Sequence, residues 1–238
     1  MQINAFFWQW GGGIWDEANE PNAPVLGVVN SAENIAEFER FLELLEYSPP
    51  IAKTGQMGIF EIQDLYMQGK IAAIVDWAAL AAPVIDPASS QVSNVTSFGL
   101  MPGNIRNGEL DRSANLGGQP FVLTTWNSDQ VIAEAIDLVK WWLSESTQIA
   151  AVKAGGQSGL QSVMNNPDYD SWAPWNLAFR QSLPWQKDLW HVPEMFEMLT
   201  QQQEEFDRAI TGQVSAREAL DAVAEFQDEL LRGADRLN

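Results

Sequence analysis

Tryptophan is the residue type that most strongly suggests chemistry in this chain, which has 11 tryptophans in 238 residues. An indole ring offers a flat apolar face with a polar N–H at its edge. Sugar rings have apolar C–H faces and hydroxylated rims, so tryptophans beside glycines, acidic groups or amides are suited to hold them. A core built only for packing would use leucine, isoleucine and valine. The alternative is that most of these rings are core or subunit contacts.

Four places in the sequence combine ring faces, polar side chains and glycines. They are Trp8 and Trp10 before the run 11–13 of three glycines, Asp76 with Trp77, Gly117-Gly118-Gln119, and Gly156-Gln157-Ser158. Trp175, which follows Pro174, is a weaker candidate for stacking. Glycine lets backbone N–H groups approach a ligand closely, but turn geometry alone explains a glycine pair equally well.

The sequence lacks the patterns of common catalytic and metal sites. His191 is the single histidine and no G-x-S-x-G segment accompanies it, so we expect no Ser-His-Asp triad and no catalytic residue of that kind. Short acidic pairs have no supporting histidine or cysteine, so we expect no metal site and no cofactor. A glycoside hydrolase needs two carboxylates across a cleft. Asp76 is the best single candidate, and the sequence names no partner for it.

The amino-acid composition restricts the classes of molecule that this protein is expected to bind. The formal charge is −19, from 32 acidic and 13 basic residues. This charge argues against nucleic acid, which requires clustered lysine and arginine, and against an anionic membrane surface. No apolar stretch approaches the roughly 20 residues of a membrane span. The first residues lack the basic region and cleavage site of a signal peptide.

Helical and strand patterns alternate along the chain, which indicates an α/β fold. We expect helices over 2–10, 31–48, 59–68 and 128–143, and two more in the last 45 residues, separated at Gly212. Ser215 and Glu218 form a capping-box pattern at the start of the last helix. Its predicted buried stripe contains Ala219, Val223, Phe226 and Leu230.

We expect strands over 71–75, 95–100 and 119–125, and a polar connector between 102 and 115. The segment 71–75 is continuously apolar, the pattern of a strand in a sheet covered on both faces. Asp76 and Trp77 stand at its C-terminal end, where ligands bind in α/β sheets.

Eight short motifs occur along the chain in an order that is typical of one protein family. They lie at 4–12, 69–77, 101–103, 116–120, 140–148, 155–158, 190–194 and 210–221. Taken together they resemble the extracellular solute-binding proteins of sugar ABC importers, and the resemblance extends over essentially the whole chain.

The resemblance implies a type II periplasmic-binding fold, in which two α/β lobes hold a sugar between them. Such proteins bind a ligand, close by a hinge and deliver it to membrane permease subunits without catalysing a reaction. Trp77 matches the aromatic residue that often stacks on the ligand. Gly117 and Gly118 match a glycine pair near the crossover, where Gln119 replaces an aromatic residue of some relatives. The segment 156–158 matches a further element, with glutamine again in place of an aromatic ring.

Family members are considerably longer than this chain. The resemblance assigns 1–102 to the first part of the C-terminal lobe, 103–157 to the crossover and a returning part of the N-terminal lobe, and 158–238 to the final helices of the C-terminal lobe. We therefore expect apolar surface that faces a missing N-terminal lobe to be exposed, with self-association as one consequence. The full-length parent is expected to be periplasmic, or lipid-anchored outside the cell.

The sequence thus predicts the carbohydrate-binding component of an ABC sugar importer, with a mono- or oligosaccharide or a sugar alcohol in an interlobe cleft. Its expected partners are the sugar and the permease membrane subunits. Two alternatives stay open: a glycoside hydrolase with paired carboxylates, and a non-catalytic interaction module whose tryptophans form an interface. The expected ligand-binding residues are Trp8, Trp10, Asp76, Trp77, Gly117, Gly118, Gln119, Gly156, Gln157, Ser158 and Trp175.

Overall fold

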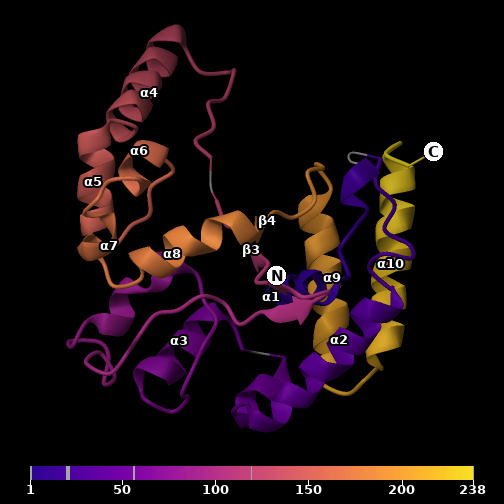
Figure 1. Cartoon of the computed structure of the whole chain (residues 1–238). Helices are drawn as coiled ribbons and strands as arrows, with labels where there is room; N and C mark the ends of the chain where they lie inside the picture. Colours follow the sequence, from indigo (N-terminus) through magenta and orange to yellow (C-terminus); the bar gives the residue numbers. More distant parts are fainter. Residues whose placement is uncertain (1, 20–21, 56, 119, 238) are drawn as a thin grey trace.

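The computed structural model of the chain describes residues 2–19, 22–55, 57–118 and 120–237, and the described part is largely helical (Figure 1). The α-helices are α1 (Gln2–Trp10), α2 (Ala32–Glu43), α3 (Ile59–Met67), α4 (Asp129–Trp142), α5 (Glu145–Lys153), α6 (Gln161–Met164), α7 (Tyr169–Trp172), α8 (Asn176–Ser182), α9 (Met195–Ile210) and α10 (Ala216–Gly233). The 3-10 helices are η1 (Glu17–Asn19), η2 (Leu44–Tyr47), η3 (Pro50–Thr54), η4 (Ala78–Leu80), η5 (Ala82–Ile85) and η6 (Leu183–Trp185). The strands are β1 (Asn104–Arg106), β2 (Glu109–Asp111), β3 (Ala114–Asn115) and β4 (Gln186–Lys187).

The predicted helices are confirmed where the sequence carries local start and stop signals. Ser31 caps α2 by accepting a hydrogen bond from the Asn34 N–H, and Ser128 caps α4 in the same way. Helices α1 and α3 are followed by Gly11 and Gly69, whose φ angles are +95° and +70°. This left-handed conformation ends a helix with little strain only at glycine.

The largest core lies among α1, α2, α9 and α10. Phe7, Phe38 and Phe206 meet there, with ring centroids 4.7 to 6.3 Å apart. A second cluster beside it contains Trp8 and Trp190. Aromatic pairs at such edge-on distances add to the stabilisation that burial provides.

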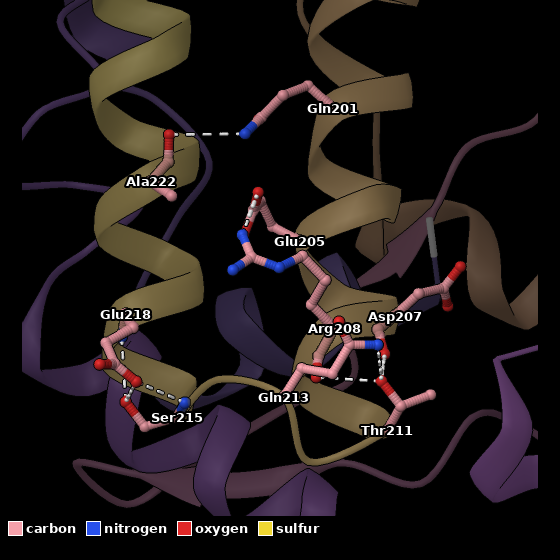
Figure 2. A network of polar contacts seen from close by, with 9 residues as sticks. All are labelled: Gln201, Glu205, Asp207, Arg208, Thr211, Gln213, Ser215, Glu218 and Ala222. Atoms are coloured by element: carbon pink, nitrogen blue, oxygen red, sulfur yellow. Dashed lines mark hydrogen bonds and ion pairs between the residues drawn. The ribbon is translucent and has the colours of Figure 1, made fainter.

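A tight turn joins α9 to α10, and Figure 2 shows its polar contacts. Ser215 Oγ accepts from the Glu218 N–H, and a Glu218 carboxylate oxygen accepts from the Ser215 N–H at 2.8 Å. The predicted capping box is therefore confirmed. The Ser215 N–H and the Ser215 hydroxyl both donate to the Glu218 carboxylate, and these two hydrogen bonds lower the pKa of the Glu218 carboxyl. Arg208 pairs with Glu205 one turn back along α9, at 2.7 Å.

The predicted buried stripe of α10 is only partly right. Ala219 and Val223 are fully buried, whereas Phe226 and Leu230 are half-buried. The buried line of the helix passes instead through Leu220, Ala224, Gln227 and Leu231. The difference arises because α10 packs on both α9 and α2, so its contact face is broader than one row of apolar residues.

The strands predicted over 71–75, 95–100 and 119–125 are wrong for the residues that the structure describes. These segments are irregular, and Val95, Phe121 and Val122 are 74, 59 and 76% exposed. A strand requires hydrogen bonds to the backbone of a neighbouring strand. Within the described ranges, the chain forms only two two-stranded sheets, and neither one lies alongside these segments.

The polar connector predicted over 102–115 instead contains a β-hairpin. β1 and β2 pair antiparallel, with Asn107 and Gly108 in the turn at φ angles of +53° and +84°. An Asn-Gly pair favours this type of tight hairpin turn. After the hairpin, β3 pairs in parallel with β4, which lies far along the chain.

Figure 1 shows two helical parts with β3 and β4 between them. Helices α1, α2, α9 and α10 lie on one side, and α3 to α7 lie on the other, with α8 leading back toward the middle. No described helix is both long and apolar enough to cross a bilayer. The assignment of residue ranges to two lobes stays a prediction.

Candidate ligand-binding site

The short β3–β4 pair draws distant parts of the chain together. Beyond β3, the Leu116 N–H donates to the Lys187 carbonyl at 2.7 Å. On the other side of the pair, Gln9 Nε2 of α1 donates to the Ser113 carbonyl at 2.8 Å, and this contact is buried. The N-terminal helix, the segment 113–117 and the segment 186–187 therefore share one neighbourhood, which we call the central junction.

Trp8 lines the central junction from α1. Its side chain is only 2% exposed, and the Lys187 ammonium lies 5.7 Å from the ring centroid. The same ammonium lies 3.5 Å from Glu17 Oε1. One face of the Trp8 ring is thus occupied by a cation, an attractive arrangement that also keeps the cation in place.

Trp77 reaches the central junction through Gly117. A Cβ atom at position 117 would lie 3.7 Å from Trp77 Cε2 and 3.8 Å from Trp77 Nε1, so Gly117 lies close to the indole. The Trp77 side chain is nevertheless 40% exposed. The Leu80 N–H donates to the Trp77 carbonyl at 2.9 Å and starts η4, which fixes the backbone that presents the ring. Trp77 therefore offers an accessible aromatic face beside a glycine.

Asp76 precedes this ring, and its two carboxylate oxygens differ. Oδ1 accepts from the Trp77 N–H at 2.7 Å. Oδ2 is buried and has no hydrogen-bond partner among the described residues. Burial raises the pKa of the Asp76 carboxyl, and the hydrogen bond from Trp77 opposes the rise. A hydroxyl donor from a ligand would satisfy Oδ2.

Trp175 lies in a neighbouring cluster that η4 and η5 connect to Trp77. Its ring centroid is 5.5 Å from that of Phe98, edge-on, and Ala78 and Ala82 pack against the same cluster. Trp175 is 4% exposed, so the described residues cover it almost completely. A Cβ atom at Gly155 would lie 3.8 Å from its ring.

The segment 156–158 is held mainly by structural contacts. The Gly156 N–H donates to the Ala151 carbonyl at 2.9 Å and closes the end of α5. Ser158 Oγ donates to Gln148 Oε1 at 2.9 Å and accepts from the Leu160 N–H. Gln157 differs, because its Oε1 accepts from the Tyr169 hydroxyl while its Nε2 is buried without a partner in the described part of the chain.

Two of the expected ligand-binding residues, Trp10 and Gly118, are not drawn into these neighbourhoods. The Arg40 guanidinium of α2 lies 4.2 Å from the ring centroid of Trp10, so Trp10 turns toward α2. Gly118 is exposed, and a Cβ atom there would have no described atom within 4 Å. Gln119 lies outside the described residues.

Buried polar atoms without a hydrogen-bond partner are spread over the described chain, and some of them belong to the expected residues. Such atoms include Trp8 Nε1, Asp76 Oδ2, Gln157 Nε2 and Trp175 Nε1. Buried polar groups in folded proteins nearly always have a hydrogen-bond partner, so each of these atoms calls for one. Asp76 Oδ2 can accept from a ligand hydroxyl and Gln157 Nε2 can donate to one, whereas the described residues cover Trp8 and Trp175 almost completely. Within the described ranges, no three histidine or acidic residues gather in a way that would hold a metal ion.

A groove that the sequence patterns did not indicate adjoins the central junction. It has a volume of about 490 Å³ and lies between the β1–β2 hairpin and the segment 184–187. Arg106, Asp111, Trp185 and Lys187 are among its lining residues. The Asn-Gly pair at 107–108 was the available signal, because it predicts the hairpin that forms one wall.

No family model matches the chain, and the search of curated proteins gave no match. Solved structures do match. Maltose-bound MalE3 of T. maritima aligns with a TM-score of 0.82 at 20% identity, covering 96% of this chain and 56% of that one. A ribitol complex of an ABC transporter solute-binding protein from Agrobacterium radiobacter K84 gives 0.79 at 20% identity, covering 96% and 55%. A tagatose-bound solute-binding protein from Thermotoga lettingae gives 0.79 at 16% identity, covering 97% and 56%.

These alignments confirm the predicted type II periplasmic-binding fold. The chain spans a little over half the length of each of these solved proteins, so the likeness applies to that part of their fold. By their own descriptions, the first of these neighbours is maltose-bound, and the other two are ABC transporter solute-binding proteins in complex with ribitol and with tagatose.

Proposed function

We propose that the chain is a member of the sugar-binding proteins of ABC importers and that it binds a sugar or sugar alcohol without altering it. The observation that carries this proposal is the Trp77 ring, which is accessible, lies against Gly117 and follows a carboxylate with an unpartnered oxygen. The fold supports it, since proteins of the same fold are described as complexes with maltose, ribitol and tagatose.

In this proposal the sugar ring stacks on Trp77, and Gly117 leaves room beside the indole. Base–aromatic stacking gives a comparable magnitude, about 1–3 kcal/mol per ring. Asp76 Oδ2 accepts from a ligand hydroxyl, and Gln157 Nε2 donates to another. The formal charge of −19 repels anions at long range, so the proposed ligand is not an anion.

The wider role follows from the same family assignment. We infer that permease subunits of an importer receive the ligand and that the protein works outside the cytoplasmic membrane. Residues 1–102 and 158–238 would belong to one lobe, and 103–157 to the crossover and part of the other. Trp8, Trp10, Gly118, Gln119, Gly156, Ser158 and Trp175 stay candidates for the lining of the cleft.

A fluorescence screen tests the proposal. Maltose, ribitol, tagatose and mannitol are each titrated into the chain, and tryptophan emission is recorded. We expect saturable changes with at least one of them. The variant Trp126→Ala is the matched control, since Trp126 is 84% exposed and lies outside the central junction. It should bind as the wild type does, whereas Trp77→Ala should not.

The same samples separate binding from hydrolysis. The raised pKa of Asp76 is the observation that a glycoside hydrolase would also require of its acid. Chromatography of the sugar after long incubation should return it unchanged. Cleavage of maltose that disappears in Asp76→Asn would favour the hydrolase instead.

A further inference from the structure

The groove beside the central junction lies between two parts of the chain that are distant in sequence. The β1–β2 hairpin supplies one wall and the segment 184–187 supplies the other, with a volume of about 490 Å³ between them. Pockets that hold small ligands usually have volumes of about 300–1,000 Å³. The groove is therefore large enough to hold a small molecule.

The hairpin wall carries charged side chains in fixed positions. Arg106, Glu109 and Asp111 line the groove. Arg106 Nη2 lies 3.6 Å from Asp111 Oδ2, and a Cβ atom at Gly11 would lie 2.8 Å from Arg106 Nη1, so the end of α1 supports the guanidinium from another side. Asp111 Oδ1 accepts from the Ser113 N–H and hydroxyl at 2.8 and 2.7 Å. The guanidinium N–H groups and Asp111 Oδ2 are thus held at the groove, with hydrogen-bonding capacity left for a ligand.

The opposite wall combines an aromatic ring with a cation. Trp185 is half-buried, and among the described residues its ring pairs with no other ring and has no cation against its face. Trp8 and Trp10 differ, because a cation covers one face of each. Lys187 lines the groove two residues after Trp185, and Glu17 holds its ammonium at 3.5 Å. This wall therefore offers an accessible part of an indole beside a fixed ammonium group.

The charges of the groove restrict the class of ligand. Its lining contains two cations, Arg106 and Lys187, and two carboxylates, Glu109 and Asp111, so their formal charges cancel. An anion would meet the two carboxylates, and a cation would meet the arginine and the lysine. Hydroxyl groups can accept from the cations and donate to the carboxylates at the same time. A neutral molecule with many hydroxyl groups and one apolar face therefore matches both walls, with its apolar face on Trp185.

We propose that this groove is a second saccharide site, in which a sugar ring lies on Trp185 while its hydroxyl groups bind Arg106 and Asp111 on the opposite wall. Trp77 is not among the lining residues, so this site is separate from the one in the proposed function. The two sites can therefore be tested independently of each other.

The indole N–H signals in nuclear magnetic resonance spectra of the isotope-labelled full chain test the second site. Trp185→Phe and Trp77→Phe each remove one signal and so assign the two rings. Glucose, maltose and maltotriose are then titrated in turn. We expect at least one of them to shift the Trp185 signal saturably, and we expect this shift to persist in Trp77→Ala. The signal of Trp126, which is 84% exposed and outside the groove, should not move.

A variant on each wall tests the proposed contacts. Arg106→Gln should weaken the binding that Trp185 reports about fivefold or more, because it removes a charged donor. Arg217→Gln is the matched control, since Arg217 is an exposed arginine on α10, and it should leave binding unchanged. Trp185→Ala should weaken binding roughly five- to 150-fold. The backbone N–H signal of Asn107, which also lines the groove, reports binding in that variant.

Four results would overturn this proposal. They are a Trp185 signal that no saccharide shifts, a response to phosphate or to glycine in place of the saccharides, equal weakening by Arg106→Gln and Arg217→Gln, and loss of the Trp185 response in a folded Trp77→Ala variant. A Trp185 response that persists while the Trp77 signal responds to no sugar would support the second site and refute the role proposed for Trp77.

Discussion

Glu37 of α2 provides a prediction whose size follows from the structure. Its side chain is 4% exposed, and its carboxylate lies 3.2 Å from Arg40 Nε. Burial raises the pKa of Glu37 from 4.5 to about 7, and the charge and hydrogen bond of Arg40 reduce the effect of burial. The folded protein therefore prefers Glu37 protonated near neutral pH, while the unfolded chain prefers it ionised.

The sign and size of the effect follow by linkage. Because the folded pKa is above the unfolded one, the stabilisation is fully present below pH 4.5 and is lost as the pH rises through about 7. Each pKa unit corresponds to 1.36 kcal/mol, so the full shift would give about 3 kcal/mol. Arg40 is 55% exposed and brings solvent near the pair, so we expect about 1–2 kcal/mol.

Glu37→Gln removes the titration while keeping the shape of the side chain. Urea unfolding is measured at pH 5 and pH 8 for the wild type, for Glu37→Gln and for Glu39→Gln, an exposed glutamate on the same helix. Between these pH values, the wild type and Glu39→Gln should lose about 1–2 kcal/mol more stability than Glu37→Gln does. Equal pH dependence of all three proteins would refute the reasoning.

Three further predictions concern glycine packing, capping and the candidate site. Gly12→Ala should lower the free energy of unfolding in urea by about 2–4 kcal/mol. The added Cβ would lie 1.7 Å from Asn34 Oδ1 and would displace the Asn34 amide, which donates to the Gly13, Val28 and Val29 carbonyls. Gly118→Ala should be nearly neutral, and similar losses of stability for the two variants would contradict this packing. Ser215→Ala should cost about 1 kcal/mol by removing the cap of α10, and an unchanged midpoint would show that the cap contributes nothing. Lowering the pH through the raised pKa of Asp76 should weaken sugar binding, because protonation of the carboxylate removes a hydrogen-bond acceptor. Asp76→Asn should bind the sugar more weakly than the wild type and should lose that pH dependence. Equal pH dependence of binding by the wild type and by Asp76→Asn would exclude Asp76 from the site.

Local signals in the sequence were sufficient to predict α1 to α4, α9 and α10, whereas α5 to α8 were not predicted. Ser31, Ser128 and Ser215 mark helix starts because their hydroxyl groups accept from nearby backbone N–H groups. Gly69 and Gly212 mark helix ends through positive φ angles. These interactions lie within a few residues, so no knowledge of the tertiary fold is required.

The strands could not be predicted in the same way. The apolar run 71–75 has the composition of a buried strand, but a strand exists only where a neighbour supplies hydrogen bonds. The pairing of β3 with β4 joins residues about seventy positions apart, and neither segment carries a distinctive pattern. The hairpin at 104–111 was predictable from Asn107 and Gly108, whose preference for a tight turn is local.

The candidate site was predictable in its residue types and less so in its geometry. Asp76, Trp77 and Gly117 were expected from the sequence; a hydrogen bond joins Trp77 to Asp76, and the Trp77 ring lies close to Gly117. The orientation of Trp10 toward Arg40 depends on the packing of α1 against α2, which the sequence does not display. Lys187 has no local signal, because its position beside Trp8 follows from β4.

Calorimetric titration of the wild type and Trp77→Ala with the sugar that the fluorescence screen identifies tests the central claim most directly. Stacking worth about 1–3 kcal/mol predicts that the variant binds roughly five- to 150-fold more weakly, with the sugar recovered intact. Equal affinity for the two proteins, with the fold of the variant preserved, would contradict the account.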